Sequence, residues 1–202
     1  MKENNVTFAL DHIVLNWVTG FATWAEHKSM LCLGQGDVAV ANIHNMASNG
    51  QTDMLEEVLK KNCSRIDEKK DGMTPLMVAS IAGHIDTVEM LLNFGADVNI
   101  TEWWSENSAL VWACESGNTK IVALLISHGA CVNSSTLQGH SPLITACRTG
   151  HTTIAELLVT RGAQLMSRTK EGRGALDYLE KEEDRKRLEE LAGVYENANK
   201  FF

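Results

Sequence analysis

The sequence predicts an all-α fold, a solenoid in which pairs of short helices joined by hairpin loops are stacked along the chain. The first observation is a triplet that recurs at offsets of 34, 33 and 33 residues: Thr74-Pro75-Leu76, Ser108-Ala109-Leu110, Ser141-Pro142-Leu143 and Gly174-Ala175-Leu176. The second is a glycine nine residues after the start of each of the first three triplets, with a Leu-Leu pair further on. A Gly-Ala pair then closes each of these three units. A fixed period near 33 residues indicates one structural unit repeated along the chain.

The unit at residues 72–99 shows how its helices arise. Thr74 is a suitable N-cap and Pro75 suits the first helical position, so a short helix is predicted to begin there. Gly83 ends this helix because glycine readily adopts the left-handed cap conformation. A second helix is predicted from about Asp86, and its apolar face consists of Val88, Leu91 and Leu92. Neither helix is long enough to be stable alone, so each must bury its apolar face on the neighbouring units.

The two end units are predicted to differ from the three central ones. Residues 36–68 carry the same pattern in weaker form and are interpreted as a degenerate first unit. At the other end, residues 172–193 keep the first helix, and the second helix is expected to be short and highly charged. Two i,i+4 ion pairs are predicted on it, Glu182 with Lys186 and Glu183 with Arg187. This last unit is interpreted as a C-terminal cap, because an end unit needs a polar outer face.

These triplets and glycine turns resemble the ankyrin-repeat family. The resemblance implies an ankyrin-repeat domain of five units over residues 36–195, between an N-terminal segment (1–35) and a C-terminal tail (196–202). It also implies a protein partner, bound by the hairpin tips and by the concave face that the first helices form. Carried over to this chain, the expected partner-binding residues are Met73, Met77, Ile81, Trp104, Asn107, Glu115, His140, Arg148 and Arg173.

One hairpin departs from the repeat. The step from Thr74 to Ser108 is 34 residues, one more than the unit, and the additional residue falls in the hairpin that carries Trp103 and Trp104. A tryptophan pair on a charged surface indicates a use, since burying each ring removes a large apolar area from water. Exposure is expected for Trp104, whereas Trp112 is expected to fill the core.

The motifs of common enzyme classes do not occur in the sequence. Neither G-x-G-x-x-G nor G-x-x-x-x-G-K-[ST] is present, so no phosphate-binding loop is predicted. The resemblance implies a structural role for His84 and His151, which bond backbone at the turn. Cys114 and Cys147 are predicted to be core residues on neighbouring first helices, with a redox or metal role as the weaker alternative. We therefore expect no enzyme activity, no metal and no cofactor.

Composition narrows the class of partner. The chain of 202 residues has a formal net charge of −8, which opposes non-specific nucleic-acid binding because such binding neutralises phosphates. DNA and RNA are therefore not expected as direct ligands. The five cysteines are odd in number and show no C-x-x-C spacing, which favours a reducing compartment, the cytosol or nucleus.

The apolar stretch at residues 6–25 does not fit the repeat, and four interpretations of it stay open. It contains 13 apolar residues in 20. The first three interpretations are an additional helical element over the first unit, a membrane span and a signal peptide. The fourth is a partner-docking segment, or a stretch with no stable structure in the isolated chain. The span is disfavoured because the uncharged window has 14 residues, while a span needs about 20. The signal peptide is disfavoured by Glu3, Asp11 and His12.

The sequence thus predicts a non-catalytic adaptor, scaffold or specificity subunit that presents a preformed surface to another protein. The alternative is a membrane-associated regulator tethered through residues 6–25. Within the array, Leu124 is expected to be a fully packed core residue.

Overall fold

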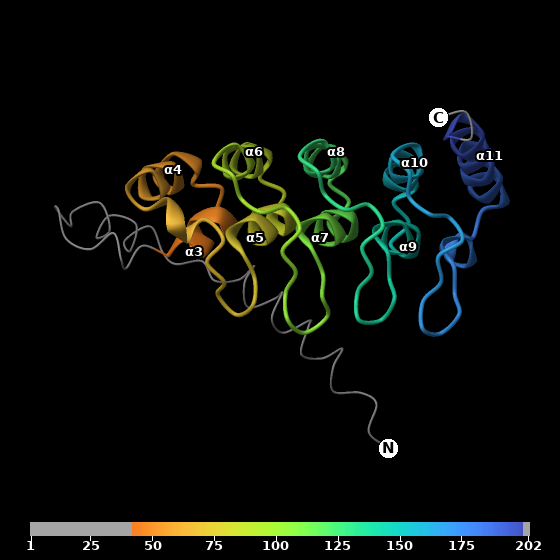
Figure 1. Cartoon of the computed structure of the whole chain (residues 1–202), viewed down its shortest axis with the longest axis horizontal. Coiled ribbons are helices and arrows are strands. Elements are labelled where there is room, and N and C mark those ends of the chain that lie inside the picture. The colour runs from red at the N-terminus through yellow and green to blue at the C-terminus, as the bar shows by residue number, and fades with distance from the viewer. Residues whose placement is uncertain (1–41, 200–202) are drawn as a thin grey trace, which may run out of the picture. The chain divides into compact units, whose positions relative to one another are not determined.

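The computed structural model describes residues 42–199, which form two rows of helices with hairpin loops on one side (Figure 1). The first helices of successive units are α3 (Ile43–Ser48), α5 (Pro75–Ala82), α7 (Ala109–Ser116) and α9 (Pro142–Arg148). The second helices are α4 (Thr52–Lys61), α6 (Ile85–Asn93), α8 (Thr119–Ser127), α10 (Thr152–Thr160) and α11 (Glu182–Asn199). Two short 3₁₀ helices are η1 (Cys63–Arg65) and η2 (Ala175–Tyr178). Paired helices in the described units, short in all but the last, confirm the predicted fold class.

The predicted caps account for where the first helices begin and end. The hydroxyl of Thr74 accepts a hydrogen bond from the backbone N–H of Met77 (3.3 Å), and Ser108 and Ser141 cap α7 and α9 in the same way. Gly83 ends α5 with a φ of 81°, a left-handed conformation that favours glycine. Each cap satisfies backbone groups that have no partner inside a short helix.

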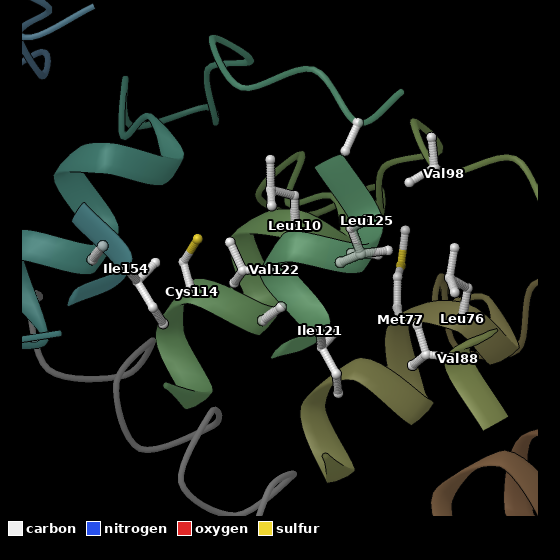
Figure 2. Packing of buried hydrophobic residues seen from close by; sticks show 14 of the residues in the cluster. Leu76, Met77, Val88, Val98, Leu110, Cys114, Ile121, Val122, Leu125 and Ile154 are labelled. Atoms are coloured by element: carbon white, nitrogen blue, oxygen red, sulfur yellow. The ribbon is translucent and has the colours of Figure 1, made fainter. Parts of the chain in front are cut away.

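The core lies between the two rows and runs from unit to unit. Helix α5 packs between α3 and α7, and α7 packs between α5 and α9. Leu76, Leu110 and Leu143 occupy the same place in successive first helices and are at most 1% exposed. Figure 2 shows Leu110 and Leu125 among the buried residues that α7 and α8 contribute. Burying one such leucine stabilises the fold by about 1.5–3 kcal/mol, so the array is held together mainly between neighbours.

Two side chains lie differently from the sequence expectation. Leu124 is partly buried at the edge of the core, whereas the adjacent Leu125 is fully buried. Trp112 is also only partly buried against the core. The Leu-Leu pair spans the boundary of a helix face, and which member points inward depends on the rotation of α8, which the repeat period does not define.

Polar contacts between neighbouring units set their register. The Nε2–H of His84 donates to the carbonyl of Ser48 at 2.8 Å, confirming the structural role predicted for this histidine. In the loops, Asn99 donates to the carbonyl of Gly129 (3.2 Å) and accepts from the N–H of Cys131 (2.9 Å). Asn133 repeats this pattern with Gly162 and Gln164, at 3.0 Å and 2.9 Å. Each asparagine thus holds the loop of the following unit.

The last unit is longer than predicted. Helix α11 extends through Asn199 and crosses the expected boundary at residue 195, and the first helix of the unit is the 3₁₀ helix η2. The predicted i,i+4 pairs are not among the ion pairs of residues 42–199. Arg185 lies 3.8 Å from Glu182, and Arg187 reaches Glu156 of α10 at 2.7 Å. Since Arg187 has a partner on the neighbouring helix, it ties the cap to the array.

The apolar stretch at residues 6–25 lies outside the described residues, so its four interpretations stay predictions. Between residues 42 and 199, no helix combines the length and the apolar character needed to cross a bilayer.

A matched pair of substitutions in α8 tests the core. Leu125→Ala is expected to cost about 2–5 kcal/mol, because it removes fully buried carbons and leaves a cavity. Leu124→Ala, the same change one residue earlier, is expected to cost distinctly less. Urea unfolding of both variants is the measurement, and equal midpoints would contradict the packing described for α8.

A second prediction concerns His44, which is 1% exposed and donates from Nε2 to the carbonyl of Met73 at 2.9 Å. Burial lowers the pKa of His44 from its ordinary value of 6.5. The unfolded chain therefore binds a proton before the folded one does as the pH falls. Stability is expected to decrease below about pH 6.5.

The variant His44→Met removes this titration, and methionine occupies the equivalent place in the next unit, at Met77. Thermal unfolding between pH 8 and pH 5 is expected to show a smaller loss for the variant than for the wild type. Parallel curves would show that His44 does not titrate on unfolding.

Candidate functional site

The hairpin tips form one connected row along the side of the array where the loops project (Figure 1). The N–H of Leu137 donates to the carbonyl of Ser105 in the preceding hairpin at 2.8 Å. In the same way, Lys170 donates to the carbonyl of Gln138 at 3.1 Å. At the first tip, the Nζ of Lys69 donates to the carbonyl of Thr101 at 2.9 Å. Because the tips are bonded to one another, they present a surface that is ordered before any partner arrives.

The long hairpin is organised around a buried carboxylate, that of Glu102, which is 1% exposed. One of its oxygens accepts from the N–H groups of Trp104 (2.7 Å) and Ser105 (2.9 Å), and the other accepts from Asn107 (3.0 Å). In the next two hairpins a threonine hydroxyl at the equivalent position accepts one N–H. The longer side chain with two oxygens thus accommodates the additional residue of this hairpin.

Sequence reasoning missed Glu102. The available signal was a glutamate standing where the following units have Thr136 and Thr169, in the one hairpin with a different length. Glu106 in the same turn has a φ of 61°, an uncommon conformation for a residue with a side chain. The contacts to Glu102 hold this turn in place.

The expected exposure of Trp104 is wrong, and its neighbour takes that role. Trp103 is 74% exposed, whereas Trp104 is partly buried and its Nε1 is shielded from solvent. The two rings meet edge to face, with centroids 5.5 Å apart and an interplanar angle of 90°. A Cβ atom at Gly72, in the preceding hairpin, would collide with both rings. The ring of Trp103 therefore packs against Trp104 and Gly72.

The expectation that Met77 lies on a partner-binding surface is also wrong. Met77 is fully buried in the core and offers no surface to a partner, and the corresponding Val111 and Ile144 are 3% and 0% exposed. These positions follow the caps of the first helices and point between the rows. Of the other expected residues, Arg148 and Arg173 are exposed, and the following are partly buried: Met73, Ile81, Asn107, Glu115 and His140.

The structure brings some of these residues together. Arg148 on α9 lies 3.1 Å from Glu115 on α7, joining equivalent positions of neighbouring first helices. Burial lowers the pKa of His140, and the charge of nearby Arg148 acts in the same direction. Arg173 lies over the ring of Tyr178 at 5.9 Å and 3.6 Å from Glu171. The face thus carries ion pairs with exposed edges, and burial together with Arg148 favours the neutral form of His140.

The buried cysteines are core residues, as predicted. Cys114 and Cys147 are at most 1% exposed. Burial raises the pKa of both thiols, that of Cys147 to about 12. Both remain protonated at neutral pH, so neither supplies the thiolate that nucleophilic or metal-binding cysteines need. Within residues 42–199 we find no group of three or more histidine, cysteine, aspartate or glutamate side chains that is arranged to hold a metal ion.

Comparison with known proteins agrees with this architecture. A family model described as "Ankyrin repeats (3 copies)" matches residues 39–102 and 102–169. Together these matches cover more than half of the chain, and the helix pairs and hairpins have the form expected of such repeats. The chain belongs to the ankyrin-repeat family, whose repeats form protein-binding modules.

Individual relatives match over only part of this chain. The chain is 34% identical to chicken inversin (Gallus gallus) over 113 residues, which is 55% of this chain and 10% of inversin. It is 38% identical to zebrafish (Danio rerio) palmitoyltransferase ZDHHC17 over 71 residues, 35% of this chain and 12% of that protein. Identity to the fruit fly (Drosophila melanogaster) ankyrin repeat and KH domain-containing protein mask is 35% over 94 residues, 46% of this chain and 2% of mask. The chain thus spans about a tenth or less of these proteins.

A matched pair of substitutions tests the role of Glu102. Glu102→Gln is expected to destabilise the protein by about 1–3 kcal/mol, since it replaces one charged acceptor by an amide that cannot accept from Asn107 and Trp104 together. Glu106→Gln, the same change in the same turn on an exposed side chain, is expected to stay within about 0.5 kcal/mol of wild type. Urea unfolding gives both values, and faster amide exchange at Trp104, Ser105 and Asn107 is expected only for Glu102→Gln.

Proposed function

We propose that this protein is an adaptor, scaffold or specificity subunit that binds another protein through its hairpin tips and the adjoining ends of its first helices. The observation that carries the proposal is the row of hydrogen-bonded tips. In this row Trp103 is exposed and packs against Gly72 of the preceding hairpin. Exposed tryptophan and arginine side chains are enriched among residues that dominate binding energy. A preformed surface also loses little conformational entropy on association, which favours this type of recognition.

We further propose that the protein is not an enzyme. The groups that first suggest chemistry have structural roles, since His84 bonds the carbonyl of Ser48 and the thiols of Cys114 and Cys147 are buried and protonated. The proposed location is the cytosol or the nucleus. Support comes from the free thiols of Cys63 and Cys131, which are exposed and would be open to oxidation in a secreted protein.

A second candidate function is a membrane-associated regulator tethered through residues 6–25. It is favoured by the 13 apolar residues in that stretch and disfavoured by its short uncharged window. The two candidates differ in whether the N-terminal segment or the array determines the partner.

Affinity capture from cell lysate, followed by mass spectrometry, tests the binding surface. The full chain is expected to recover at least one protein whose yield falls several-fold in the double variant Trp103→Ala with Arg148→Ala. The matched control changes the opposite face, Glu89→Ala with Lys120→Ala on α6 and α8, and is expected to leave the yield unchanged. Loss of the partner in the control alone would assign binding to the second helices.

Deletion of residues 1–35 separates the two candidates. An array that folds through its own repeats is expected to keep its helical circular dichroism and its partner, as well as its distribution between soluble and membrane fractions. Release from the membrane fraction upon deletion would instead support the tether.

A further inference from the structure

The four hairpin tips differ in chemistry in an ordered way. Each of the two central tips exposes one large apolar side chain, Trp103 (74% exposed) and Leu137 (39% exposed), and the tip with Trp103 also exposes Glu106. The two end tips are basic: the first carries Lys69 and Lys70 and the last carries Lys170 and Arg173. Each end tip has a single acidic residue, Asp71 or Glu171. An apolar centre thus lies between two ends at which basic residues outnumber acidic ones.

The hairpin that carries Trp103 has two acidic residues, Glu102 and Glu106, and no basic residue, and further acidic residues lie on the second helices. Helix α6 carries Asp86 and Glu89 without a basic residue, and the first turn of α11 carries Glu182, Glu183 and Asp184. These helices belong to the row away from the tips (Figure 1). A negatively charged ligand is therefore repelled by α6 and α11 and attracted to the basic end tips, which favours binding on the tip side.

The bonds between neighbouring tips make the spacing of these groups a fixed property. Lys70 and Lys170 lie in the first and fourth hairpins, three repeats apart. Packed helices lie about 8–10 Å from one another, so three repeats span roughly 24–30 Å. An extended peptide covers about 3.3 Å per residue, and about seven to nine residues bridge this span.

We propose that the row of tips binds an extended partner segment of about nine residues, with large apolar side chains at its centre and a carboxylate near each end. The apolar side chains contact Trp103 and Leu137, and the carboxylates meet Lys70 and Lys170. This inference rests on the proposed function, because it names the class of protein segment that the same surface selects.

Selection of a displayed random nine-residue peptide library on the full-length protein tests the inference. Enriched peptides are expected to carry Asp or Glu towards both ends and aromatic or aliphatic residues between them. Synthetic copies are expected to lose at least about tenfold in affinity for Trp103→Ala. The matched control is Met166→Ala, which removes an apolar side chain that is 73% exposed but lies away from the tips, and it is expected to leave affinity unchanged.

Charge reversal makes the test specific for the end tips. The double variant Lys70→Glu with Lys170→Glu is expected to select peptides with basic ends from the same library and to bind the acidic peptides more weakly. Lys120→Glu on α8 reverses an exposed charge on the opposite face and is expected to select the same peptides as wild type. Raising the salt concentration is expected to weaken the wild-type complex with the acidic peptides.

Two results would overturn the inference. One is a set of selected peptides whose binding is insensitive to Trp103→Ala and to the charge reversal, and the other is no enrichment by the wild type over Trp103→Ala. Neither result decides the proposed function, which is judged by the capture of a partner from lysate and by its loss in the tip-side double variant.

Discussion

Burial of short helices between neighbouring repeats is the constraint on which the rest of this structure depends. The helices α3 to α10 have 6 to 10 residues each, too few to be stable in isolation. Leu76, Leu110 and Leu143 have essentially no exposed surface because the first helix of one unit covers that of the next. Folding is therefore cooperative between neighbours, and a defect in one unit weakens the units on both sides.

The tip surface derives its order from this packing and from the polar contacts that accompany it. Apolar contacts alone define a distance between units but not their register. The directional bonds of His84, Asn99 and Asn133 fix how each unit is placed on the next. Once the units are in register, the hairpins come close enough to bond at their tips, as Ser105 does with Leu137. The placement of Trp103 thus follows from contacts made far from its ring.

Local signals in the sequence were sufficient for much of the fold. Thr74 and Pro75 begin a helix, and Gly83 ends it, for reasons that involve only a few neighbouring residues. The period of the triplets then places every central unit. The cysteine assignments followed equally well, since Cys114 and Cys147 occupy the same apolar position in two units.

The failures concern side chains whose direction depends on tertiary contacts. Leu124 and Leu125 are residues of the same type, and the rotation of α8 about its axis determines which of them is fully buried. Trp103 and Trp104 were distinguishable only through Gly72 of another hairpin and through Glu102, whose carboxylate shapes the turn. The length of α11 was missed because the last unit was expected to have a short, highly charged second helix. One of these charged residues, Arg187, has its partner Glu156 on a neighbouring helix.

The loop contacts of Asn99 and Asn133 have a direction, since each asparagine side chain bonds backbone groups of the unit that follows. The position one unit further on is Met166, which has no amide to offer and is 73% exposed. Met166 therefore cannot make the contacts by which Asn99 and Asn133 hold a following loop. A duplicated central repeat would keep the asparagine contacts to its neighbours. A repeat added after α11 would lack such a contact from the loop of Met166.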